Sequence, residues 1–354
     1  MPDSQSNLNY RINEFVKAGN SEAAVKILYD AVVSAAKNKD FVRAEVLLEQ
    51  IYEVDDMALT EIVKSGEIIE QEKSKAINSS HKQIWSSLYD TLNREQANAF
   101  YFAMEERLVD TDQTIIKQGQ LPDGLLFINK GQAKIVWKDA GTEVLLAKLG
   151  PGQVAGHDTF FDISVATTSV IALTPVHFSL LKREKTAAWE KTAPSLSYRL
   201  KEYLRRFEMS CDLVKQKGID RRRHQRFHLE GGAKLQLLNS AGIAIGKPLK
   251  SYFSNISKGG VSVEILLPNQ KTAETLLGRN IRITFSIGEG KQSVGYEMIG
   301  TINGVSELWQ NEFSVHVRFD ILLPASLMSE FSSLKPFAET VTQSAPSQQQ
   351  TEES

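Results

Sequence analysis

Residues 221–227 carry the sequence Arg-Arg-Arg-His-Gln-Arg-Phe, and residues 255–260 carry Asn-Ile-Ser-Lys-Gly-Gly. The first stretch places guanidinium groups directly ahead of a pattern that is typical of a β-strand. The second stretch is a polar turn between two apolar runs, Leu249 to Phe253 and Val261 to Leu266, which we predict to be strands. Together the two stretches predict a small β-structure that carries two polar segments.

The residue types in these segments suit an anionic ligand. Arginine binds phosphate oxygens through its planar fork and stacks its flat face on aromatic rings, and Arg222 and Arg226 lie close enough in sequence to act together. Asn255 and Ser257 add short hydrogen-bonding side chains, while Gly260 permits close backbone approach to a ligand. Two simpler alternatives remain: the arginines are a solvated or nonspecific nucleic-acid-binding face, and the second stretch is only a turn.

The combination Arg-x-x-x-Arg and Asn-x-Ser-x-x-Gly resembles the motif of PilZ domains, which are bacterial receptors for cyclic di-GMP. The resemblance covers roughly residues 218–337, and it includes strand patterns at 281–285 and 313–319. It implies a six-stranded antiparallel β-barrel. We add Arg221 as a further guanidinium that favours a stacked pair of ligand molecules over a single one. The expected ligand-binding residues are Arg221, Arg222, Arg226, Asn255, Ser257 and Gly260.

Short apolar runs alternate with glycine-rich turns in the middle of the chain, which is typical of a β-sandwich or jelly roll. The order of these runs resembles the cyclic nucleotide-binding domain of catabolite-activator-type regulators over about residues 81–182. Three segments carry the resemblance, at 115–119, 126–131 and 149–156. It implies a jelly roll with flanking helices.

The phosphate-binding segment departs from that family. The family pattern opens with Gly-Glu and later carries an arginine that neutralises the cyclic phosphate. Here Gly156 is followed by His157, and Ala166 stands about where the arginine belongs. Because an unpaired buried phosphate is costly, we expect a degenerate site that does not bind cyclic AMP in the usual way. His157 is either a substitute ligand group or a satisfied polar residue.

Helical patterns precede and follow the jelly-roll region. Residues 1–80 resemble a single tetratricopeptide-like helical hairpin, which fits a protein-binding region, a small helical cap or a dimerisation arm. Residues 183–217 predict a long linker helix that Pro194 interrupts. Its apolar stripe over 196–214 fits either a homodimer seam or packing against a neighbouring domain.

Composition excludes several classes of protein. The 354-residue chain has a formal net charge of −2, so any affinity for phosphate must be local. Its single cysteine excludes an intramolecular disulfide framework. We see no signal peptide, no membrane span, no P-loop and no clustered metal ligands. We therefore expect a cytoplasmic chain that is not an enzyme and has no cofactor.

These patterns predict a multidomain α+β chain with a helical region (1–80), a jelly roll (81–182), a linker helix (183–217), a PilZ barrel (218–337) and a disordered tail (338–354). We expect a bacterial receptor in which cyclic di-GMP reorients domains to regulate a protein partner, through the N-terminal helices or the jelly roll. One alternative is a scaffold that binds no nucleotide. Another is a cyclic-nucleotide-responsive regulator of the activator family without DNA binding, because strand patterns replace the expected recognition helix.

Overall fold

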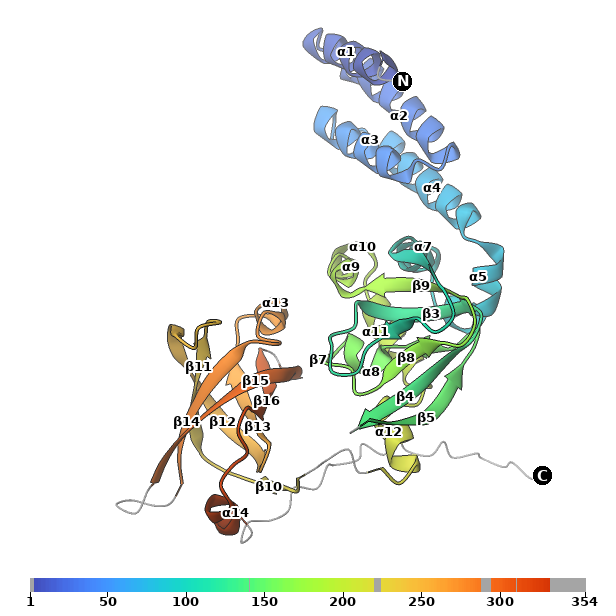
Figure 1. Cartoon of the computed structure of the whole chain (residues 1–354). Coiled ribbons are helices and arrows are strands. Elements are labelled where there is room, and N and C mark those ends of the chain that lie inside the picture. The colour runs from blue at the N-terminus through green and yellow to red at the C-terminus, as the bar shows by residue number, and fades with distance from the viewer. Residues whose placement is uncertain (1–2, 140, 220–223, 288–293, 310, 332–354) are drawn as a thin grey trace, which may run out of the picture. The chain divides into compact units, whose positions relative to one another are not determined.

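The computed structural model describes residues 3–139, 141–219, 224–287, 294–309 and 311–331. The chain divides into two compact units, which are described one at a time (Figure 1). The first unit comprises residues 1–117, 122–157 and 168–209, and the second comprises residues 118–121, 158–167 and 210–354. The tail at 338–354, for which we predicted disorder, lies outside the described residues.

Four helices form the first part of the first unit: α1 (Asp3–Lys17), α2 (Ser21–Lys37), α3 (Phe41–Val54) and α4 (Leu59–Ala76). Their apolar faces share one buried core. Side-chain caps begin the middle helices, because Asn20 accepts a hydrogen bond from the Ala23 amide and Asp40 accepts one from the Arg43 amide. The region therefore contains two helices more than the single hairpin that its sequence resembles.

Two four-stranded sheets form a jelly roll in the first unit, as predicted. The first sheet has the order β1 (Met104–Val109), β9 (Val176–Lys182), β3 (Gly124–Lys130) and β6 (Val154–Ala155). The second has the order β2 (Thr114–Ile116), β8 (Ser169–Ala172), β4 (Ala133–Asp139) and β5 (Thr142–Leu149). Three short helices lead into it: α5 (Ser79–Ile84), α6 (Ser86–Tyr89) and α7 (Arg94–Phe102).

A buried set of polar side chains joins α5 to the jelly roll. The Trp85 indole Nε1 donates a hydrogen bond to Asn129 Oδ1 at 2.9 Å, and Asn129 Nδ2 donates to Ser179 Oγ at 2.7 Å. His81 places Nδ1 3.4 Å from the same hydroxyl, is only 3% exposed, and meets the ring of Tyr101 edge-on. This helix is thus fixed to the sheet by both aromatic and hydrogen-bonded contacts.

The buried position of His81 predicts a stability that depends on pH. Burial lowers the pKa of His81 to about 4 from 6.5, although its hydrogen bond with Asn129 opposes the shift, so the folded chain keeps the ring neutral. The stabilising contribution is complete above about pH 6.5 and is lost as the pH falls toward 4. We expect the free energy of unfolding to fall by about 2 kcal/mol more between pH 7 and 5 than in a His81→Phe variant. Urea titrations followed by tryptophan fluorescence measure this difference, and equal losses in both proteins would contradict it.

The linker helix that we predicted over residues 183–217 breaks at Pro194, as expected, and also at further points. The segment forms α9 (Arg183–Thr186), α10 (Trp189–Thr192), α11 (Leu196–Leu204) and α12 (Ser210–Gln216). Directly after Pro194, Ser195 has a left-handed backbone with φ 66°, which a continuous helix cannot contain. The α11 part of the apolar stripe is at most 6% exposed within the single chain, which favours internal packing over a dimer seam there.

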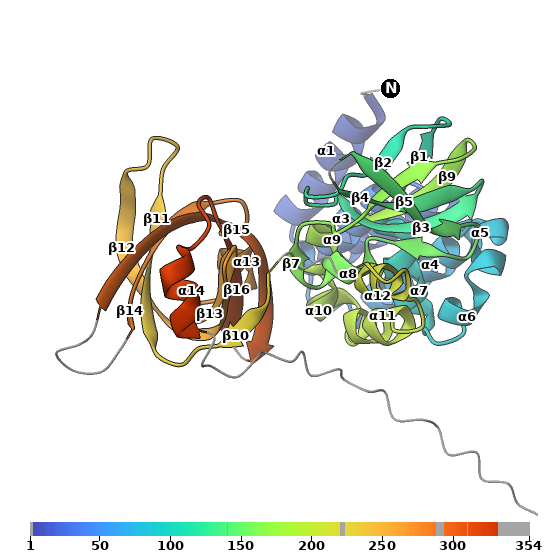
Figure 2. The same cartoon turned by 60° about the horizontal axis from the view of Figure 1, so that its bottom comes forward.

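The second unit contains a closed six-stranded antiparallel barrel, as predicted. Its strands follow the order β12 (Ala244–Ser257), β11 (Gly232–Leu238), β14 (Asn280–Ile287), β15 (Val294–Trp309), β16 (Glu312–Phe319) and β13 (Gly260–Leu266), and β13 pairs again with β12. Figure 2 shows these strands curving around the enclosed core. Helices α13 (Gln270–Glu274) and α14 (Ala325–Phe331) add buried residues to this core and lie at opposite ends of the barrel (Figure 1).

Two short strands extend the barrel sheet. β10 (Arg226–His228) pairs with β12, and β7 (Ile163–Ser164) pairs with β15. β7 follows α8 (His157–Phe160) and comes from a stretch that the sequence assigns to the jelly roll. Among the described residues, no helix has the length and apolar character that crossing a membrane requires.

Candidate functional site

The strand register places the predicted ligand residues on the outer face of the barrel. Arg226 in β10 pairs with Ser257 in β12, and the next pair, Phe227 and Ile256, is buried in the barrel core. Because side chains alternate between the two faces of a strand, Arg226 and Ser257 face away from that core. Asn255 shares this outer face because it lies two residues before Ser257.

One row of residues crosses the barrel wall at the level of Asn255. Each member of the row faces the next across neighbouring strands, from β12 through β13, β16 and β15 to β7. The members are Asn255, Ser262, His316, Gly304 and Ser164. Serine and glycine make up most of the row, so His316 has the largest side chain in it.

Hydrogen bonds join Arg226 to this row. Its Nη1 donates to Asn255 Oδ1 at 3.1 Å and to Ser262 Oγ at 3.4 Å. Ser262 Oγ also lies 2.8 Å from His316 Nδ1. Asn255 and Ser262 are 4% and 1% exposed, so these bonds fix the guanidinium from beneath. An arginine held in this way is oriented before any ligand arrives, which lowers the entropy lost on binding.

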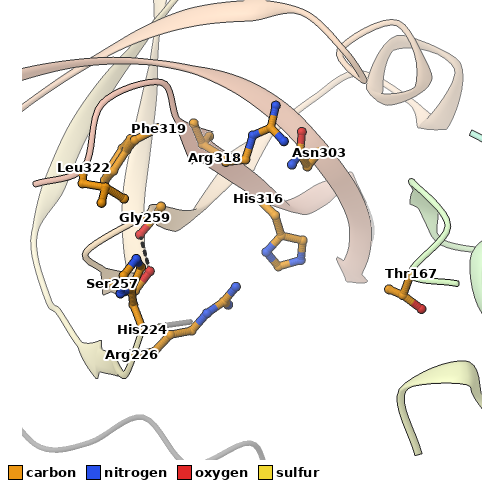
Figure 3. Close-up of a pocket in the computed structure, with 12 residues that line it drawn as sticks. Thr167, His224, Arg226, Ser257, Gly259, Asn303, His316, Arg318, Phe319 and Leu322 are labelled. Carbon is orange, nitrogen blue, oxygen red and sulfur yellow. Dashed lines mark hydrogen bonds between the residues drawn. The ribbon is translucent and has the colours of Figure 1, made fainter. Parts of the chain in front are cut away.

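A cavity of about 530 Å³ opens beside this arrangement (Figure 3). In Figure 3, Arg226 and His316 extend into the same space between the strands. The described residues that line the cavity include two arginines and two histidines but no carboxylate. They are Thr167, His224, Arg226, Ser257, Gly259, Gly260, Asn303, His316, Val317, Arg318, Phe319 and Leu322. Such a lining favours an anion that also presents flat or apolar surface.

Two of the predicted ligand residues also have clear structural roles. A Cβ atom at Gly260 would lie 2.4 Å from the Val317 carbonyl oxygen, so glycine is needed where β13 passes β16. Ser257 Oγ donates a hydrogen bond to the Gly260 carbonyl at 3.1 Å and fixes the turn between β12 and β13. Both residues line the cavity, but the barrel itself accounts for their presence.

The remaining arginines of the predicted clamp are not placed by the structure. Arg221 and Arg222 lie outside the described residues. Their neighbour His224 lines the cavity, and its ring lies 3.1 Å from the position that a Cβ at Gly259 would take. The chain that leads into β10 therefore passes along the cavity at residue 224.

The three residues that we assigned from the sequence to a degenerate cyclic-nucleotide site are divided between the two units. Gly156, with φ +83°, and His157 belong to the first unit, where His157 Nε2 lies 3.1 Å from the Glu208 carbonyl oxygen. Ala166 belongs to the second unit, where its amide donates a hydrogen bond to the Gln120 carbonyl at 2.8 Å. The unit boundaries thus separate residues that the family pattern groups together.

Sequence reasoning missed the contribution of β16 to the site. His316 and Arg318 line the cavity from this strand, and Ser262 contributes from β13. The signal was present, because residues 313–319 alternate apolar and polar side chains. That alternation predicts polar residues on the outer face of the barrel. The strand pairing that brings them beside Arg226 is not visible in the sequence.

Three solved structures illustrate what the chain resembles. A cyclic nucleotide-binding domain from Methylobacillus flagellatus is 18% identical, with a TM-score of 0.33, over 39% of this chain and 78% of that one. The Thermus thermophilus catabolite activator protein is 25% identical, with a TM-score of 0.32, over 37% and 62%. The regulatory subunit of a cAMP-independent protein kinase A from Trypanosoma brucei is 18% identical, with a TM-score of 0.34, over 42% and 52%.

Residues 106–189 match the model of the cyclic nucleotide-binding domain. No curated protein matches the chain. The matched stretch contains the whole of β3 to β9, which includes most of the jelly roll. Residues 106–189 are therefore a cyclic nucleotide-binding domain, which confirms the resemblance that the sequence showed.

Proposed function

We propose that this chain is a receptor, without enzymatic activity or cofactor, whose barrel binds cyclic di-GMP. The observation that carries the proposal is the arrangement of Arg226. Its guanidinium is anchored to Asn255 and Ser262 at the edge of a cavity whose described lining contains no carboxylate. A charged donor fixed in this way suits a phosphate oxygen.

The size and chemistry of the cavity support a nucleotide. Its volume of about 530 Å³ falls within the range of small-ligand sites, roughly 300–1,000 Å³. Guanidinium planes at Arg226 and Arg318 offer stacking surfaces for a purine, while Asn303 and His316 offer hydrogen-bonding groups for base edges. Cyclic di-GMP combines two phosphates with two guanines and therefore uses all of these groups.

The cyclic nucleotide-binding domain is a second place where a nucleotide could bind. The cyclic nucleotide-binding domain at residues 106–189 favours a nucleotide ligand there by its family. Ala166 provides no positive charge where the family pattern has an arginine, and its peptide group is hydrogen-bonded to Gln120. We therefore assign this domain a relay role and do not expect it to bind cyclic AMP in the family's usual manner.

The signal needs a recipient, and the N-terminal helices offer a surface for one. Leu8 in α1 and Val42 and Val46 in α3 line a groove of about 300 Å³. Val42 and Val46 are 76% and 48% exposed. This groove, which combines exposed apolar side chains with the polar residues Asp40 and Arg43, supports a protein partner at the helices rather than a homodimer through α11, whose stripe is buried.

A calorimetric titration of the full chain tests the receptor assignment. We expect heat with cyclic di-GMP and none with cyclic AMP. The substitution Arg222→Ala should weaken cyclic di-GMP binding by about 2–4 kcal/mol, which is the cost typical of removing one partner of a buried charge pair. The matched control is Arg282→Ala on β14, whose guanidinium pairs with Glu297 at 3.1 Å and does not line the cavity. No heat with cyclic di-GMP in a folded wild-type chain would overturn the proposal.

A further inference from the structure

Residues 158–167 belong to the barrel unit even though they fall inside the stretch that matches the cyclic nucleotide-binding domain. Within this segment, Ile163 faces Val305 and Ser164 faces Gly304 as β7 pairs with β15. Ile163 is 3% exposed and belongs to the barrel core. The segment is thus an added strand of the barrel, anchored by an apolar side chain.

The barrel has an open strand edge at this position. The pairing of β14 with β15 ends at Thr301, although β15 continues to Trp309. An unpaired edge leaves backbone donors and acceptors exposed, and proteins usually cover such edges. Here the Val165 amide donates a hydrogen bond to the Asn303 carbonyl at 3.2 Å. The segment therefore completes hydrogen bonding along β15 that the six barrel strands leave unmade.

This added strand reaches the candidate ligand site. At Gly304, a Cβ atom would lie 3.4 Å from the Ser164 Cβ and 3.3 Å from His316 Cδ2, so the glycine permits both neighbours to approach. Thr167, three residues after Ser164, lines the cavity together with Asn303 and His316 (Figure 3). One wall of the cavity is therefore made by the segment and by the part of β15 to which it is bonded.

We infer that residues 163–167 are a built-in wall of the barrel's ligand site, and that ligand binding and the seating of this strand on β15 stabilise each other. The inference rests on the proposed function for its ligand. A ligand that contacts both Arg226 and Thr167 binds more tightly when β7 is paired with β15. Ligand binding and the pairing of β7 with β15 are therefore coupled. Residues 158–167 are joined to the first unit at His157 and at Thr168. This wall of the site is therefore covalently linked at both ends to the rest of the cyclic nucleotide-binding domain.

A single backbone change tests the coupling. Val165→Pro removes the amide that donates to Asn303, while extended backbone at Ser164 remains compatible with a following proline. The matched control, Val165→Ala, trims the side chain and keeps the amide. In full-length protein, we expect Val165→Pro to weaken cyclic di-GMP binding about tenfold, or about 1.4 kcal/mol, and Val165→Ala to bind as the wild type does. Equal affinity in all three proteins would overturn the inference.

Two further measurements separate this inference from the receptor proposal. Hydrogen–deuterium exchange of the wild type should slow in residues 163–167 when cyclic di-GMP is added, and unchanged exchange there despite calorimetric binding would overturn the coupling alone. Thr167→Trp leaves β7 unaltered and fills the cavity from the wall, so it should reduce affinity at least tenfold. Tight binding to Thr167→Trp would place the ligand elsewhere, whereas no binding to the wild type would overturn the receptor proposal itself.

Discussion

Replacing Arg226 by alanine is expected to weaken cyclic di-GMP binding by about 2–4 kcal/mol, which is roughly a 30- to 1,000-fold loss. The guanidinium is the best-fixed positive group in the described part of the cavity, since Asn255 and Ser262 both accept its Nη1 hydrogen bonds. Its loss removes a charge aimed at phosphate and takes one hydrogen-bond donor from the buried Asn255, while Ser262 keeps its contact with His316. Calorimetry on the folded variant measures the effect.

Companion variants separate the causes of this loss. Arg226→Lys keeps the charge but not the planar fork, so we expect an intermediate affinity if bidentate geometry matters. Ser262→Ala keeps the arginine and removes one anchor, which should cost about 1 kcal/mol of binding through a looser guanidinium. Arg282→Ala, on the same barrel but away from the cavity, serves as the control. Wild-type affinity in Arg226→Ala would remove the central residue of the proposed site.

Gly260→Ala should lower the stability of the barrel by about 2–3 kcal/mol, before any effect on ligand is considered. The added Cβ would meet the Val317 carbonyl oxygen at 2.4 Å, and that oxygen belongs to a strand backbone held in the sheet. Relief of this contact requires β13 and β16 to separate. Urea unfolding followed by circular dichroism should show an earlier transition for this variant.

The neighbouring glycine provides the control for this substitution. A Cβ at Gly259 would meet only side-chain atoms, of His224 at 3.1 Å and Leu322 at 3.7 Å, and these can move aside. Gly259→Ala should therefore change stability by less than about 1 kcal/mol. If Gly260→Ala were as stable as the wild type but bound ligand poorly, the glycine would serve the ligand rather than the barrel.

Local sequence patterns predicted several barrel strands because each of them carries its own apolar or alternating pattern. Polar residues flank the runs at 249–253 and 261–266, and apolar and polar side chains alternate within the closing strand at 313–319. These patterns are local, so they can be recognised in the sequence without knowing which strands pair. The predicted turn at 255–260 is shorter in the structure: only Lys258 and Gly259 form it, whereas Asn255 to Ser257 end β12 and Gly260 begins β13.

Features that depend on distant contacts escaped prediction. Pro194 indicated the break before α11, but the sequence did not show the other breaks that divide residues 183–217 into four helices. The association of β7 with β15 joins parts of the chain that no local pattern connects.

The long sequence separation between β7 and β15 affects how the barrel folds during synthesis. During synthesis, residues 158–167 leave the ribosome long before β15 has been made. Ile163 therefore stays outside the barrel core until β15 is available to pair with β7. Contacts of such sequence separation form slowly because a long loop must close first. A fragment cut to residues 218–331 would lack this strand altogether. Its uncovered β15 edge and the core space that Ile163 fills in the full chain would favour edge-to-edge pairing between molecules.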